Sequence, residues 1–155
     1  MDPYLRPILI SSTIVLIFNT LLILPVISAP IVTYFLGGAL AVFLYWKELK
    51  EKFTERMPEI QFFDIAALGL GVGLVAGGIL AFIFALKMQN PELESQLVGQ
   101  INESIKLKGL PDTQMINELT PAFAYGVGIF IIILGTILSF LGGITAWTFV
   151  NRAKK

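Results

Sequence analysis

The sequence predicts an all-α integral membrane protein, a bundle of four helices arranged as two helical hairpins. Three observations lead to this fold class. Residues of the AVILMFWYC set make up 55% of the 155-residue chain, and the mean hydropathy is +0.80. Charged residues make up only 14%, whereas an average soluble domain carries about 25%. The apolar residues form four continuous runs rather than alternating ones, which favours helices over the strands of a membrane barrel.

The four apolar runs define the expected membrane spans of a single domain, 1–155. They cover residues 7–27, 30–47, 62–86 and 121–150. A bilayer core needs about 20 apolar helical residues, which the second run only just approaches. Pro25 and Pro30 bracket the joint between the first two runs, and Pro30 suits the first position of a helix. We therefore expect a tight hairpin here, because a single kinked helix would be about twice as long as a membrane is thick.

The distribution of basic residues predicts the orientation. Cytoplasmic segments of membrane proteins carry an excess of Lys and Arg. One set of segments holds Arg6, Lys47, Lys50, Lys52, Arg56, Arg152, Lys154 and Lys155, and the long loop 88–120 with its approach holds only Lys87, Lys106 and Lys108. Both termini are therefore expected in the cytoplasm, with loop 88–120 outside. The first run lacks a small-residue cleavage site and is expected to be a retained span.

Aromatic residues near the span ends agree with these depths. Tyr45, Trp46 and Trp147 lie near the expected cytoplasmic ends, where amphipathic rings favour the headgroup level. We therefore expect them to be interface anchors. The alternative, that each ring is ordinary lipid-facing bulk, stays open.

Small residues recur every four positions in the third run. The resulting ladder consists of Gly69, Gly73, Gly77, Ala81 and Ala85, and the fourth run repeats the theme with Gly135, Ser139 and Gly143. In lipid, such a face lets helix backbones approach closely and gain dispersion contacts. We expect these residues to be helix-packing positions. The partner helix is either in the same chain or in another one.

The second and fourth runs resemble each other. Phe35-Leu36-Gly37-Gly38 matches Phe140-Leu141-Gly142-Gly143, and both runs end in a basic segment. Two readings stay open. The echo indicates either two parallel hairpins from a duplication, as in transporters with parallel repeats, or convergent membrane composition.

The polar residues give little chemistry. The chain has no Cys and no His, which excludes disulfides, thiol chemistry and the metal sites built from these residues. Its net charge of zero gives no case for nucleic acid binding. Asn19, inside the first run, is expected to hydrogen-bond to another helix, and Asp64 suits the N-terminal acid of the third. We therefore expect no catalytic, cofactor-binding or metal-binding residues and no enzyme activity.

Loop 88–120 is expected to hold two short helices. Asn90 is a suitable N-cap before Pro91, apolar residues recur at a helical spacing from Leu93 to Ile105, and Gly109 suits the C-terminal cap. A second helix is expected from Asp112. The loop either packs over the bundle or docks a partner, and the two alternatives do not exclude each other.

The layout resembles a group of small four-helix membrane proteins, common in Bacteroidota, that are grouped only as a domain of unknown function. The resembling parts are the Gly-rich run from Phe62 to Phe84, then Asn90-Pro91-Glu92, Lys108-Gly109-Leu110-Pro111-Asp112, Thr120-Pro121 and the ending Asn151-Arg152-Ala153-Lys154-Lys155. The resemblance covers the C-terminal part of the chain. It implies a bacterial inner membrane and no assigned activity.

These observations favour a non-catalytic accessory or scaffold subunit that packs through its Gly/Ala helix face in a larger membrane assembly. Its expected partners are the lipid bilayer and other membrane protein subunits, or copies of itself. The alternative is a small oligomeric transporter or channel, for which the parallel echo and the interior Asn19 are the evidence.

Overall fold

The protein is all-helical throughout the part that the structure describes, which confirms the predicted all-α class. The structure is a computed structural model and describes residues 3–21, 28–53, 59–109, 111 and 121–152. These residues form five helices and no strand: α1 (Leu5–Leu21), α2 (Ser28–Lys52), α3 (Phe62–Lys87), α4 (Pro91–Leu107) and α5 (Pro121–Arg152). The expected turn at Pro25 and the short helix expected from Asp112 lie outside the described residues.

The described helix bounds lie close to the predicted ones, except that α2 differs at both its start and its end. This helix begins at Ser28, so Pro30 is its third residue and not its first. The first turn of a helix has no intrahelical N–H bonds, so proline is tolerated there. At the other end, α2 continues past Lys47 to Lys52, because the charged residues that follow the apolar run are good helix formers.

Local signals define the ends of α4. The side-chain Oδ1 of Asn90 accepts a hydrogen bond of 3.0 Å from the backbone N–H of Glu92, as an N-cap does. Gly109 follows the helix with a φ of 65°, a conformation that favours glycine. Both caps therefore lie where the sequence predicts them, and α4 is one of the two helices expected in loop 88–120.

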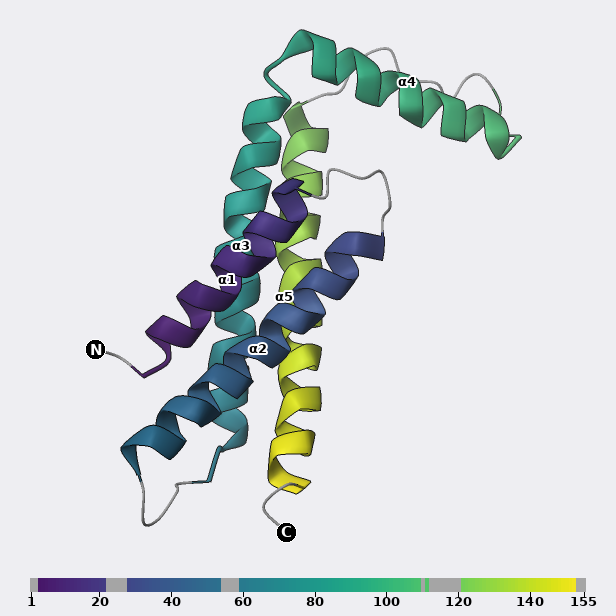
Figure 1. Cartoon of the computed structure of the whole chain (residues 1–155). Helices are drawn as coiled ribbons and strands as arrows, with labels where there is room; N and C mark the ends of the chain where they lie inside the picture. The colour runs from purple at the N-terminus through teal and green to yellow at the C-terminus, as the bar shows by residue number, and fades with distance from the viewer. Residues whose placement is uncertain (1–2, 22–27, 54–58, 110, 112–120, 153–155) are drawn as a thin grey trace.

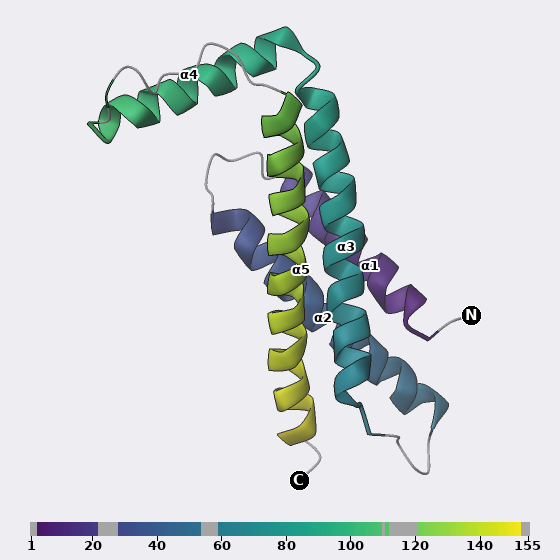
Figure 2. The same ribbon diagram turned by 180° about the vertical axis from the view of Figure 1, so that it is seen from behind.

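The helices form two layers. α3 and α5 run side by side, and α1 and α2 cross them obliquely on one face, as Figure 1 and the reverse view in Figure 2 show. α4 lies across one end of the α3–α5 pair and extends away from it. The core fills the space between the layers and consists of Val15, Tyr34, Ala41, Val42, Tyr45, Leu49, Ile60, Ile65, Leu68, Val72, Ala76 and Val150.

Two of the described helices are long and apolar enough to cross a membrane. They are Phe62–Lys87, with a mean hydropathy of 2.3, and the stretch Tyr125–Arg152 of α5, with 2.5. The apolar part of α1, Leu5–Asn19, is shorter. The structure thus supports two apolar helices of membrane length, and the four-span arrangement stays a prediction.

Candidate functional site

The glycine ladder of α3 packs directly against the backbone of α5. A Cβ atom built on Gly69 would lie 2.7 Å from Cα of Phe140, and one on Gly77 would lie 3.0 Å from Cα of Ile132. Between them, a Cβ atom built on Gly73 would overlap the backbone of Thr136. Real Cβ atoms do not approach as closely as one on Gly69 or Gly73 would, so these two positions require glycine at the present helix separation, while a Cβ on Gly77 would make an unusually tight contact.

The ladder continues toward α4 with weaker contacts. The Cβ of Ala81 lies 3.4 Å from the position that a Cβ on Gly128 would take, and Ala85 is partly buried. The partner helix of the ladder, which the sequence leaves undecided, is therefore α5 of the same chain over the three glycines.

The two segments that echo each other in sequence meet where α2 crosses α5. Gly38 lies against the backbone of Ser139, and Gly142 lies against the backbone of Phe35. The hydroxyl of Ser139 donates a hydrogen bond of 3.1 Å to the carbonyl oxygen of Tyr34. The small residues of both segments thus allow the backbones of α2 and α5 to come into contact at one helix crossing. The sequence shows both segments and gives no sign that they contact each other.

The other two small residues of α5 face different neighbours. The ring of Tyr34 covers Gly135, where its Cε1 atom lies 2.6 Å from the position of a built Cβ. Gly143 faces Ile65 of α3 and Val42 of α2. All three small residues of α5 therefore lie inside the chain, between α2 and α3. Tyr34 is a packing residue that the sequence analysis does not single out.

Asn19 joins α1 to α2. Its side-chain Nδ2 donates hydrogen bonds of 2.8 Å to Oγ1 of Thr33 and of 2.8 Å to the carbonyl oxygen of Val15. In an apolar bundle, such an interhelical bond contributes about 0.6–2 kcal/mol. The structure thus places the predicted interhelical polar residue opposite a hydroxyl of the neighbouring helix.

A polar cluster, which we call the Tyr4 cluster, closes the end of the bundle where α3 begins. It consists of Tyr4, Arg6, Tyr45, Glu48 and Asp64. The Tyr4 hydroxyl donates a hydrogen bond of 2.6 Å to Oδ1 of Asp64, and the other carboxylate oxygen accepts one of 2.7 Å from the backbone N–H of Gln61. Asp64 therefore caps α3, as predicted, and also anchors the chain before α1.

Stacking and an ion pair complete the Tyr4 cluster. The rings of Tyr4 and Tyr45 stack with centroids 5.1 Å apart, and Arg6 lies 3.5 Å from the carboxylate of Glu48. The bond to Asp64 raises the pKa of Tyr4 well above its usual value, with a further contribution from Tyr45, because the carboxylate accepts the proton that ionisation would remove.

The three expected interface anchors take different positions. Tyr45 is 6% exposed and belongs to the core, so its ring lies inside the bundle. Trp147 donates a hydrogen bond of 3.0 Å from Nε1 to the carbonyl oxygen of Ile60, which ties α5 to the segment before α3. Trp46 is partly buried, with the ammonium of Lys50 5.5 Å from its ring centroid.

Comparison with known proteins adds no relative. No family model matches the chain, and neither the curated proteins nor the solved structures include a match. The resemblance to small four-helix bacterial membrane proteins therefore stays a prediction from layout.

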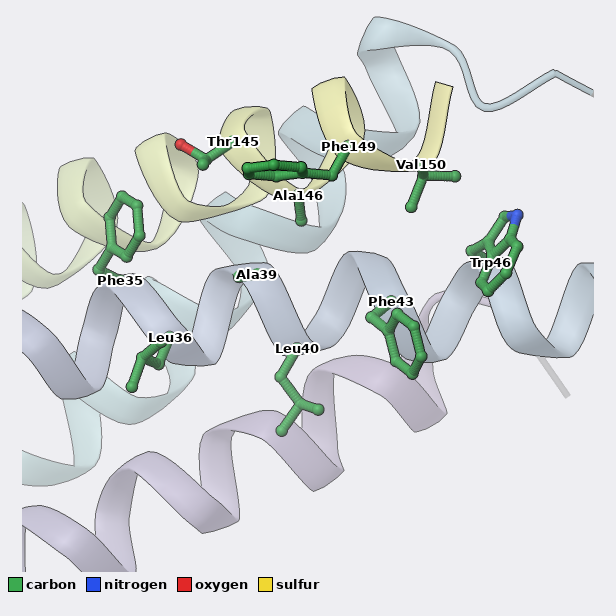
Figure 3. A pocket seen from close by; sticks show the side chains of 10 residues that line it. All are labelled: Phe35, Leu36, Ala39, Leu40, Phe43, Trp46, Thr145, Ala146, Phe149 and Val150. Atoms are coloured by element: carbon green, nitrogen blue, oxygen red, sulfur yellow. The ribbon is translucent and has the colours of Figure 1, made fainter. Parts of the chain in front are cut away.

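Two apolar grooves flank α2. One lies between α1 and α2, has a volume of about 500 Å³ and is lined by residues such as Ile14, Phe18, Leu36 and Leu40. The other lies between α2 and α5 and has a volume of about 590 Å³. Figure 3 shows its lining, which is apolar apart from one hydroxyl and the indole N–H: Phe35, Leu36, Ala39, Leu40, Phe43, Trp46, Thr145, Ala146, Phe149 and Val150.

Two adjacent hydroxyls of α1 are buried, a feature that no sequence pattern indicates. Ser11 and Ser12 are adjacent in α1, are 0% and 1% exposed, and have no hydrogen-bond partner in the described part of the chain. An unsatisfied buried polar group destabilises a fold by about 1–3 kcal/mol. Among the described residues, no three His, Cys, Asp or Glu side chains gather as a metal site would need.

Proposed function

We propose that this chain is a multi-pass membrane protein of four spans, α1, α2, α3 and α5, with both termini in the cytoplasm. One observation on α3 and α5 carries the membrane location. In the most apolar 18-residue stretches of Phe62–Lys87 and Tyr125–Arg152, only 33% and 22% of the residues are buried. A core helix of a soluble protein is mostly buried, whereas large exposed apolar surface of this kind marks contact with lipid or with another protein.

The exposed side chains on these helices support the same proposal. α3 exposes Leu70, Leu74, Phe82 and Leu86, and α5 exposes Ile129, Phe130, Ile133, Ile137 and Leu141. The last turns of α2 and α5 carry the described basic residues Lys50, Lys52 and Arg152, and these two helix ends lie at the same end of the bundle (Figure 1). That end faces the cytoplasm in the proposed orientation.

Within the membrane, we assign the chain a non-catalytic role as an accessory or scaffold subunit of a larger assembly. The small residues of α3 and α5 pack against each other and against α2, so another chain would meet a different surface. α4 offers such a surface, because it extends beyond the bundle with exposed polar residues that include Gln96 and Glu103. The alternative, a transporter or channel, has less support, because the side chain of Asn19, on which that alternative partly rests, is hydrogen-bonded to Thr33 of the neighbouring helix.

The test is mild extraction of the full chain from its source membrane with a tag at the C-terminus, followed by mass spectrometry and native mass. We expect one larger complex to co-purify in a fixed ratio. Recovery of the chain alone, or as a homo-oligomer, would contradict the accessory role and would make flux assays in liposomes the next experiment.

Paired charge reversals locate the docking surface. Glu92→Arg with Glu103→Arg changes the exposed charge of α4, and Glu51→Arg with Glu59→Arg makes the same change on exposed residues at the opposite end. We expect the α4 pair to lower recovery of the complex and the control pair to leave it unchanged. Equal recovery from both pairs would exclude α4 as the docking surface.

A further inference from the structure

The groove between α2 and α5 has the length of one membrane leaflet. Phe35 lies at one end and Trp46 at the other, on the same helix (Figure 3). At 1.5 Å per residue, the two positions are roughly 16 Å apart along α2. The hydrocarbon core of a bilayer is about 30 Å thick. The groove therefore matches the depth of an acyl chain in one leaflet and is too short to hold a helix that crosses the whole membrane.

The two ends of the groove differ in chemistry. At the Trp46 end, both helices run on into basic residues, with Lys50 exposed one turn beyond Trp46 in α2 and Arg152 exposed at the end of α5. Within the described part of the chain, neither cation pairs with a carboxylate, whereas Glu48 is paired with Arg6 and Glu51 lies 4.0 Å from Lys47. This end therefore offers positive charge that the described residues leave unneutralised.

Trp46 places an aromatic ring beside one of these cations. Its Nε1 atom is buried and has no acceptor among the described residues. The ammonium of Lys50 lies 5.5 Å from the centroid of the same ring. The exposed ammonium of Lys50 suits a phosphate oxygen, because a charged donor and a charged acceptor form a stronger hydrogen bond than neutral groups do.

We propose that this groove binds one anionic glycerophospholipid of the cytoplasmic leaflet. One acyl chain lies between α2 and α5, and the phosphate lies at the ammonium of Lys50. The inference rests on the proposed membrane location and orientation. Groove length and charge favour this occupant over a second copy of the chain, since a helix of another copy would need an apolar groove that continues across both leaflets.

The test is native mass spectrometry of the full chain in detergent micelles, titrated with phosphatidylglycerol or phosphatidylcholine of the same acyl chains. We expect one phosphatidylglycerol to stay bound and phosphatidylcholine to bind more weakly. Lys50→Gln should weaken phosphatidylglycerol binding about fivefold, the change expected for one lysine near an anionic headgroup. Ala39→Phe should fill the groove and abolish the bound lipid.

Matched variants control for general effects. Lys87→Gln removes an exposed lysine at the opposite end of the bundle, and Leu74→Phe enlarges an exposed residue on the surface of α3. Both should bind phosphatidylglycerol as the wild type does. Equal loss in Lys50→Gln and Lys87→Gln would overturn the headgroup site, and a retained lipid in Ala39→Phe would overturn the groove as its location. A bound second chain that Ala39→Phe removes would overturn the lipid in favour of self-association.

A separate measurement keeps this inference distinct from the proposed function. Wild-type protein that resists alkaline carbonate extraction and yet binds both lipids equally would contradict the lipid site alone. Release of the protein by carbonate would contradict the membrane location and the lipid site together.

Discussion

Gly38 of α2 lies against the backbone of Ser139 in α5, while the hydroxyl of Ser139 bonds to the carbonyl oxygen of Tyr34, one turn before Gly38. The two helices touch here without an intervening side chain. Because α3 makes the same kind of contact with α5 on another side, the position of α5 depends on small residues along two neighbouring helices.

Gly73→Ala should destabilise the protein by about 1–3 kcal/mol, because the added methyl group would overlap the backbone of Thr136 and force α3 and α5 apart. The matched control is Gly78→Ala in the same helix, where a Cβ would meet nothing within 4 Å. This change should leave the stability unchanged or raise it by up to about 1 kcal/mol, since alanine is the better helix former. Unfolding by SDS titration, followed by tryptophan fluorescence, measures both; equal effects would contradict the packing role.

Asn19→Leu should lose the hydrogen bond to Thr33 and destabilise the protein by about 0.6–2 kcal/mol. A double-mutant cycle with Thr33→Val isolates the pair. If the bond is the reason for the loss, the double variant should be destabilised by clearly less than the sum of the two single variants. Additive effects would mean that Asn19 and Thr33 act independently.

Tyr4→Phe should destabilise the protein by about 1 kcal/mol at neutral pH, because it removes the donor to Asp64. The pKa of Tyr4 is raised in the folded state above its value of about 10 in the unfolded chain. Its contribution is therefore complete below pH 10 and decreases as the pH rises further, since the unfolded state releases its proton first. The difference in unfolding free energy between wild type and Tyr4→Phe should therefore decrease above pH 10.

The control for this pH dependence is Tyr125→Phe, because Tyr125 is 70% exposed. Its unfolding free energy should follow that of the wild type at every pH. The difference in unfolding free energy between wild type and Tyr4→Phe could instead stay constant up to pH 12. That result would show that the hydrogen bond to Asp64 does not raise the pKa of Tyr4 in the folded protein.

Ser12→Ala should stabilise the protein by up to about 1 kcal/mol, because the hydroxyl is buried without a partner among the described residues. Thr13→Ala in the next position is the comparison, since its hydroxyl is exposed and bonds to the carbonyl oxygen of Leu9. Thr13→Ala should change the stability little. A clear loss of stability in Ser12→Ala would indicate that the hydroxyl has a partner in the folded protein.

Single cysteines test the orientation without further changes, because the chain contains no cysteine of its own. Gln96→Cys in α4 should react with a membrane-impermeant maleimide in intact cells, and Glu51→Cys at the end of α2 should react only after the membrane is permeabilised. Both residues are exposed in the structure. The reverse pattern would invert the proposed orientation, and labelling of both sites in intact cells would contradict it.

The sequence by itself determined the helical class and the positions of α3, α4 and α5, because apolar periodicity, caps such as Asn90 and Gly109, and proline act within a few residues of chain. It also identified the glycine ladder, since regular spacing is visible in one dimension. Which helix the ladder contacts depends on how the chain folds back on itself. Only the tertiary structure therefore decided that Gly73 meets Thr136 and that the two echoing segments touch at Gly38 and Ser139. The partners of Tyr4 and Asn19 were likewise beyond sequence reasoning, because contacts between distant segments depend on the three-dimensional arrangement of the helices and not on local pattern.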